Sequence, residues 1–202
     1  MVPIKLSASK SNQQGFALLM TLIVVTVVIA IGLTVLDLST KQVRLSTNAK
    51  DSEIAFHAAN AGMECARYWR RQSSALMESG QPISPSCFSV VAADARLAAI
   101  NPSDLSGDGE AYLYKYSFSW GTSPNNRCTK VINLVMVADP TGTRLLTLRN
   151  MKDYIAGFPA TSGIKTCTPG ERCTVLSVRG HNKECALNPG YGTVEREVLL
   201  QF

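Results

Sequence analysis

The stretch that decides the fold is Phe16–Leu36, FALLMTLIVVTVVIAIGLTVL, a run of 21 residues without a charge. At about 1.5 Å per residue a helix of this length covers roughly 31 Å, the hydrocarbon thickness of a bilayer. The run has no polar face at helical spacing, which disfavours a buried helix of a soluble domain. The sequence therefore predicts a membrane-spanning helix over residues 16–36.

A secretory signal peptide is the alternative interpretation of this run. Lys5 and Lys10 supply the positive start that such a peptide needs. However, the apolar stretch is longer than the usual range of about 7–15 residues. The sequence LDLS at 36–39 is also a poor exit for signal peptidase. We therefore expect the apolar segment to stay on the mature protein.

Residues 1–14 are short, hydrophilic and basic, and they end abruptly at Gly15-Phe16. This junction resembles the processing site of type IV prepilins, a group that includes minor pilins and the pseudopilins of type II secretion. The resemblance implies that residues 1–15 are a leader peptide, that a prepilin peptidase cuts between Gly15 and Phe16, and that the new Phe16 amine is methylated. A small residue before the bond lets the backbone approach a peptidase closely.

The chain departs from most pilins at Met20, where the family usually has a Glu that neutralises the Phe amine of a neighbouring subunit. A carboxylate in lipid costs about 2.5–3.5 kcal/mol on insertion scales, so it persists only where something pairs with it. PilX-type minor pilins and the tip pseudopilin of type II secretion similarly lack this Glu. The resemblance thus favours a minor, tip-located subunit, with Phe16 and Met20 as the residues concerned in assembly.

The helical pattern continues beyond the predicted span. Apolar and small residues recur at steps of three and four up to Tyr68, with no Pro between Leu38 and Arg71. The segment DSEIAFHAANAGMECA at 51–66 closely resembles the corresponding stretch of PilX-type proteins. The resemblance implies that residues 37–72 are the amphipathic continuation of the helix, packed on a sheet.

Residues 73–202 are predicted to form a globular head, because Ser73, Gly80, Pro82 and Pro85 end the helix. A short helix is expected over 88–100. Alternating residues favour strands in the remainder of the chain, expected at 112–120, 128–137, 144–148, 173–179 and 193–200. The predicted fold class is α+β, a long N-terminal helix packed on a C-terminal antiparallel sheet, as in pilins.

One face of the strand at 112–120 consists only of aromatic residues, Tyr112, Tyr114, Tyr116, Phe118 and Trp120. Strict alternation of this kind is typical of a half-buried strand. We expect this face to be buried against the helix rather than to serve as a sugar-binding or stacking platform.

Six cysteines all follow the predicted span. Disulfides persist outside the cytosol, so the head is expected to be extracytoplasmic and the N-terminus cytoplasmic, although positive charges on the two sides of the span balance. Six cysteines allow 15 pairings. The resemblance to short pilin-like proteins favours Cys65 with Cys87, Cys128 with Cys185, and Cys167 with Cys173.

Metal sites and catalytic motifs are weakly supported. No Cys-x-x-Cys pair occurs, and His57 and His181 lack ligand spacing to the cysteines, which disfavours zinc. The acidic stretch Asp104–Glu110 misses the spacing of a calcium loop, so a solvated turn is the better interpretation. No hydrolase, metalloprotease, phosphate-loop or dinucleotide motif is present, so neither enzymatic activity nor a cofactor is expected.

The distribution of charged residues does not indicate a nucleic-acid-binding surface. The chain carries 20 Lys and Arg against 15 Asp and Glu, and the basic residues are scattered among acidic ones. No nucleic acid is therefore expected as a partner.

The sequence thus predicts a non-enzymatic minor pilin or pseudopilin that moves from the bacterial cytoplasmic membrane into a filament. The expected partners are prepilin peptidase, other pilins or pseudopilins and an inner-membrane assembly platform. A type II secretion pseudopilin and a bitopic, membrane-anchored binding domain remain as alternatives, as does a secreted enzyme cut after the span. The polar segment 138–172 is a candidate contact surface.

Overall fold

The computed structural model describes residues 12–122, 126–159, 163–185 and 190–202; side chains are described from Gly15 onward, apart from that of residue 94. Most of the predicted leader, residues 1–11, lies outside this described part. The described residues divide into two compact units, one that precedes Lys50 and one from Lys50 to Phe202.

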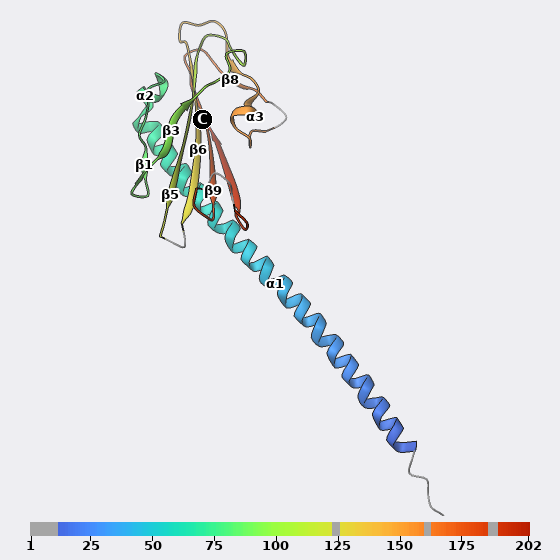
Figure 1. Ribbon diagram of the computed structural model, residues 1–202. Coiled ribbons are helices and arrows are strands. Elements are labelled where there is room, and N and C mark those ends of the chain that lie inside the picture. The colour runs from blue at the N-terminus through green and yellow to red at the C-terminus, as the bar shows by residue number, and fades with distance from the viewer. Residues whose placement is uncertain (1–11, 123–125, 160–162, 186–189) are drawn as a thin grey trace, which may run out of the picture. The chain divides into compact units, whose positions relative to one another are not determined.

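A long N-terminal helix and a C-terminal antiparallel sheet are present, which confirms the predicted α+β class (Figure 1). Helix α1 covers Asn12–Gln72 without a break. The other elements in the described residues are α2 (Ser74–Glu78), β1 (Ser86–Cys87), β2 (Val90–Val91), β3 (Ala93–Ala98), β4 (Leu105–Ser106), β5 (Gly109–Trp120), β6 (Arg127–Ala138), β7 (Leu146–Leu148), α3 (Met151–Tyr154), β8 (Lys165–Cys167), β9 (Arg172–His181) and β10 (Glu195–Gln201).

The main sheet has the strand order β10-β9-β6-β5-β3, and every neighbouring pair is antiparallel. Its long strands coincide with the strongest alternation in the sequence. The four central and C-terminal strands were expected from that pattern, and their bounds extend the expected ranges by a few residues or shift them slightly. The sheet is therefore the frame on which the second unit is built.

The part of α1 that belongs to the second unit packs on one face of the main sheet. Its buried positions are occupied mainly by small residues. Met63 and Ala66 meet the aromatic face of β5 and apolar residues of β6 and β9 in one core cluster. Besides Arg70, the buried residues of this helical segment are Ala55, Ala58, Ala59, Gly62, Met63 and Ala66.

Two glycines set how closely this helical segment approaches the sheet. A Cβ placed on Gly62 would overlap the side chain of Thr129 and lie 2.9 Å from Val178 Cγ1. A Cβ on Gly180 of β9 would overlap the helix backbone at Ala55 and Ala59. Backbone therefore lies against backbone here, which only residues without a Cβ allow.

The aromatic face of β5 is buried as predicted. Tyr114, Tyr116 and Phe118 are almost fully buried, and Tyr112 and Trp120 are partly buried. Tyr114 also donates a hydrogen bond of 2.9 Å to the carbonyl of Gln81, which follows α2. The aromatic residues thus join the sheet to the segment after the long helix.

A second layer covers part of the opposite face of the main sheet. It consists of the three-stranded sheet β4-β7-β8 and helix α3, whose apolar residues form a separate core cluster with β5 and β6. Most of this layer comes from residues 138–172, the segment expected to be a polar contact surface. Leu146, Leu148, Met151 and Ile155 of this segment are fully buried, so much of it serves as core.

The short helix expected over residues 88–100 is absent from that stretch, and this prediction was wrong. Phe88 and Ser89 take positive φ values of 56° and 60° in the turn between β1 and β2, and β3 follows. Strand β3 pairs with β5, with a bulge between Ala93 and Arg96. The alanine-rich composition favoured a helix, but long-range pairing with the edge of β5 decided the conformation.

Three disulfides fasten the second unit. They pair Cys65 with Cys87, Cys128 with Cys185, and Cys167 with Cys173, the pairs that the resemblance implied. The first joins α1 to β1, the second joins β6 to the segment after β9, and the third joins β8 to β9. No described cysteine is free.

A buried ion cluster holds the end of α1 and α2 to the sheet. Arg70 Nη2 lies 2.9 Å from Glu78 Oε1, and Arg172 Nε lies 2.8 Å from Glu78 Oε2. Arg70 Nε also donates a hydrogen bond of 3.0 Å to Thr174 Oγ1. Arg70 and Glu78 are both largely removed from solvent, so each depends on the other for charge compensation.

Candidate functional site: the exposed apolar segment of the long helix

The predicted span lies on α1 with its side chains fully displayed. The helix is long and apolar enough to cross a membrane, and none of its most apolar window is buried. Large apolar side chains with exposed fractions between 46% and 69% point in every direction around the axis. They are Phe16, Leu18, Leu19, Met20, Leu22, Ile23, Val24, Val25, Val27, Val28, Ile29, Ile31, Leu33, Val35 and Leu36.

The few polar side chains of this segment form their hydrogen bonds within the helix. The hydroxyls of Thr21, Thr26 and Thr34 donate hydrogen bonds of 2.8–2.9 Å to carbonyls three residues earlier. In lipid an unpaired polar group costs several kcal/mol, so such internal bonds suit a membrane environment. The sequence analysis missed this role, although hydroxyl residues inside an apolar helix are its signal.

The first charges after the span are paired with each other. Lys41 Nζ lies 2.8 Å from Asp37 Oδ2, one helical turn apart, and both side chains are exposed. Exposed pairs of this kind contribute only about 0.3–0.5 kcal/mol. Their value here is to mark where the apolar surface ends and a polar helix surface begins.

The predicted processing and assembly residues all lie on α1. A Cβ added to Gly15 would meet nothing within 4 Å, so no packing within the described chain requires a glycine there. Phe16 is 63% exposed and Met20, one turn later, is 47% exposed. The three residues are therefore open to whatever surrounds this helix.

An apolar surface of this extent is stable only where lipid or other apolar groups remove it from water. Soluble monomers rarely expose apolar patches beyond a few hundred Å². A helix that is apolar all round is buried either in lipid or among other apolar elements. The geometry of residues 16–36 is suited to both surroundings, and to a change from one to the other.

The comparison with protein families falls on this helix. Residues 14–64 match the family described as PilX N-terminal. Over this stretch, about a quarter of its length, the chain is similar to PilX-type, type IV pilin-like proteins. The matched stretch begins next to Gly15 and Phe16 and ends within the glycine-and-alanine segment that packs on the sheet. No curated protein and no solved structure matches the chain.

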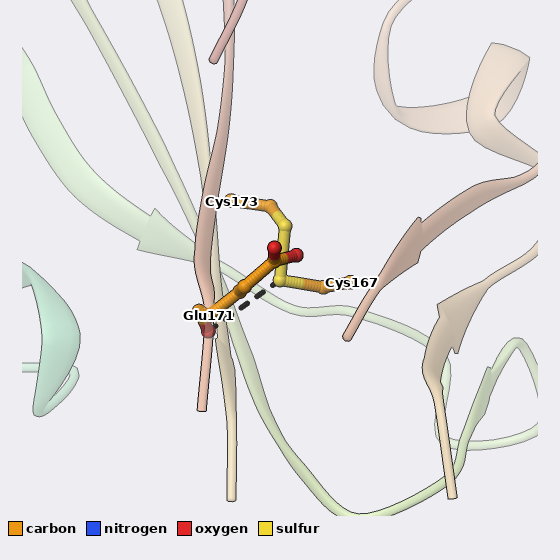
Figure 2. A group of neighbouring side chains, drawn as sticks. All are labelled: Cys167, Glu171 and Cys173. Carbon is orange, nitrogen blue, oxygen red and sulfur yellow. Dashed lines mark hydrogen bonds between the residues drawn. A yellow bond between two sulfur atoms is a disulfide. The ribbon is translucent and has the colours of Figure 1, made fainter. Parts of the chain in front are cut away.

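Among the described residues, one cluster of metal-ligand side chains occurs, formed by Cys167, Glu171 and Cys173. Figure 2 shows that the two sulfur atoms are bonded to each other beside the Glu171 carboxylate. Cysteine binds metals as a thiolate, and a disulfide has none. The cluster therefore fastens a loop and is not suited to hold a zinc ion.

The acidic turn considered for calcium uses its carboxylates internally. Both oxygens of Asp108 accept hydrogen bonds from Arg144, with the Thr143 amide as a further donor, and these bonds hold the pKa of the Asp108 carboxyl below its usual value. Asp104 accepts hydrogen bonds from Tyr154 and Asn150 at 2.6 and 2.7 Å. The turn is therefore held by internal hydrogen bonds, and Asp104 is buried rather than solvated as expected.

Proposed function

We propose that this chain is a non-enzymatic minor pilin, a subunit that assembles into a type IV pilus or a related filament through its N-terminal helix. The observation that carries the proposal is the fully displayed apolar surface of residues 16–36 on a segment that matches the PilX N-terminal family. Filament packing would replace lipid contacts with helix contacts, so assembly need not expose the segment to water.

The proposed maturation removes residues 1–15. Prepilin peptidase would cut the bond between Gly15 and Phe16, and the new Phe16 amine would be methylated. Support comes from the position of this bond at the start of the apolar surface, with no side chain on Gly15 to hinder a protease. The product would keep residues 16–36 as its membrane and assembly helix and 37–72 as the continuation of that helix, with 73–202 as the head.

The proposed topology places the N-terminus in the cytoplasm and the head outside the cytoplasmic membrane. The three disulfides of the second unit support this orientation, because disulfides persist in oxidising compartments. In this topology the subunit waits as a single-pass protein for the inner-membrane assembly platform and other pilins.

The proposed position in the filament is at or near the tip. Met20 replaces the Glu that usually pairs with a neighbouring amine, and it presents an uncharged side chain to the surroundings of the helix. A subunit without this carboxylate cannot neutralise an amine above it, so a place with no subunit above suits it best. A type II secretion pseudopilin with the same placement is the related alternative.

The N-terminal mass of the chain purified from membranes tests the proposal. We expect a polypeptide that begins with methylated Phe16 in cells that contain prepilin peptidase, and a longer one that retains residues 1–15 in cells without it. Gly15→Leu should block the cut, whereas Gly32→Leu, placed within the span, should leave it intact.

Two results would contradict this assignment. Retention of Met1 in the presence of the peptidase would support the bitopic anchored domain. A mature chain that begins beyond Leu36 and is recovered as a soluble protein would support a secreted domain instead. Recovery of the subunit in sheared surface filaments, rather than only in the cell envelope, would separate a pilus from a secretion pseudopilus.

A further inference from the structure

A small groove of about 230 Å³ lies on the main sheet, and four of its eight lining residues are basic; apolar atoms form much of its surface. Arg96 from β3, Lys115 from β5, Lys130 from β6 and Arg179 from β9 contribute to its wall. Their positions alternate with those of the aromatic face, so they lie on the sheet face opposite to α1. Sequence analysis missed the groove, because four separate strands supply its residues.

The strand register places like charges directly opposite each other. Arg96 is the cross-strand partner of Lys115, and Lys130 is the partner of Arg179. Lys115 faces Ile132, two residues from Lys130, so the two pairs are diagonal neighbours. Like charges directly opposite in a sheet are destabilising. The fold therefore keeps an arrangement that weakens it unless an anion is present.

The described carboxylates at this face are engaged with one of the four cations. Glu195 and Glu197 lie 3.6 and 3.5 Å from Arg179 Nε. Glu197 also accepts a hydrogen bond from Ser177, and Glu195 lies 3.4 Å from His181 Nε2. Among the side chains that the structure describes, none forms an ion pair with Arg96, Lys115 or Lys130. Four cations and two carboxylates leave two positive charges around the groove.

We propose that this groove binds a compact tetrahedral oxyanion, a phosphate or a sulfate, either free or as a group on a small molecule. A dianion would neutralise the two remaining charges and would accept charge-assisted hydrogen bonds from the lysines, which are the stronger class of hydrogen bond. The volume of this groove equals that of about eight water molecules, enough for such a group with a small substituent. This binding is independent of filament assembly.

Isothermal titration calorimetry tests the site. Inorganic phosphate or inorganic sulfate is titrated into the full chain in a neutral detergent, at an ionic strength held constant with chloride. We expect saturable binding by the wild type. Lys115→Gln combined with Lys130→Gln should weaken it at least about tenfold, which is the loss expected from about one charge-assisted hydrogen bond. The exposed pair Arg149→Gln and Lys152→Gln, which also removes two charges, is the matched control and should bind as the wild type does.

Thermal unfolding supplies a second readout that a merely structural role would not give. Phosphate should raise the Tm of the wild type and leave that of the Lys115→Gln/Lys130→Gln variant unchanged. In chloride alone the variant should be as stable as the wild type or more stable, because the like-charge repulsion is relieved. The charge-conserving Lys115→Arg/Lys130→Arg variant should retain binding.

Three results would overturn the proposal. They are an absence of saturable phosphate and sulfate binding by the wild type, an equal loss of binding in the control pair, and a lower Tm of the Gln variant in chloride. Binding of a nucleic acid or a vesicle of anionic lipid without any response to inorganic phosphate or sulfate would also contradict a compact oxyanion site.

Discussion

Residues 16–36 and residues 50–72 lie on the same helix, but the first segment is exposed on every side and the second is buried on one side. The first segment carries large apolar side chains, and all of them are exposed. The second carries alanine and glycine where it faces the sheet, and it is buried there down to the backbone. Large apolar residues are therefore kept for partners outside the described chain, and small residues serve the contact within it.

The difference shows that hydrophobicity alone does not identify a packed helix face. The segment at 50–72 packs closely because Gly180 admits the helix backbone and Gly62 admits the Thr129 side chain. The more apolar segment has no complementary surface in the described chain. Hydrophobic stabilisation of the first segment must come from lipid or from other subunits, whereas that of the second belongs to the fold itself.

The largest expected effect concerns the buried ion cluster of the packed region. Glu78→Ala leaves the Arg70 guanidinium buried without its partner, and removal of one partner of a buried pair costs about 3–5 kcal/mol. Chemical denaturation of the full chain in detergent measures this. Glu64→Ala, which removes a mostly exposed pair with Arg67, is the control and should cost less than about 1 kcal/mol. Equal losses for the two variants would contradict the assigned burial.

The next largest effect separates the two exposed surfaces of the helix. Val28 is 62% exposed and Phe56 is 49% exposed, but only Val28 is expected to lie in lipid. Val28→Arg should oppose membrane insertion by about 2.5–3.5 kcal/mol. Phe56→Arg should change stability by no more than about 0.5 kcal/mol, as exposed substitutions usually do. Membrane fractionation measures insertion, and denaturation measures the unfolding free energy. A similar response of both variants would contradict the expected difference between the two segments.

A smaller effect, of opposite sign in the two regions, is expected for glycine-to-alanine changes. Gly62→Ala overpacks the helix–sheet contact and should cost about 1–3 kcal/mol of unfolding free energy. Gly32→Ala meets nothing within 4 Å and should favour the helix by about 1 kcal/mol. Thermal unfolding followed by circular dichroism compares them. A stabilising Gly62→Ala would show that the helix is not in tight contact with the Thr129 and Val178 side chains.

The smallest effect is the pH dependence that His181 gives to the unfolding free energy of the second unit. Burial lowers the pKa of His181, with Lys130 and Arg179 acting in the same direction and Glu195 against it. The unfolded chain therefore takes up a proton below pH about 6.5 while the folded chain resists it, so stability falls as the pH drops through that window.

His181→Asn should flatten this dependence between pH 7 and pH 5. The carboxyl groups of Asp108, Asp139 and Glu171, whose pKa values are lowered by hydrogen bonds, do not interfere because they act only at lower pH. An unchanged slope in the variant would remove His181 as the cause.

The sequence predicted the parts of the fold whose signals are local and long. Three segments carry a pattern long enough to identify the element from sequence. They are the span from Phe16 to Leu36, the periodic helix up to Gln72 and the alternating strand that holds Tyr114 and Phe118. The helix predicted at 88–100 failed because an edge strand is decided by its partner. In the second layer only β7 was predicted, at 144–148. Strands β4 and β8 escaped prediction because they are two and three residues long and pair only with β7.

The candidate site was predictable in part. The apolar surface with Gly15, Phe16 and Met20 follows from the sequence alone, because it makes no tertiary contact that composition could hide. The basic groove could not be found in this way. Lys115 and Lys130 become neighbours only through the register of β5 and β6, which a single sequence does not disclose.

Gly62 and Gly180 fix the position of this helical segment on the sheet, because Gly62 lies against the Thr129 side chain and Gly180 against the backbone of Ala55 and Ala59. A hydrogen bond of 3.1 Å from Thr129 Oγ1 to the Ala58 carbonyl fixes the same register. Sliding this helical segment along the sheet, or turning it about its axis, would drive a side chain into space that fits only a hydrogen atom. Tension applied along this segment would therefore be transmitted to β6 and β9, the strands that carry Thr129 and Gly180.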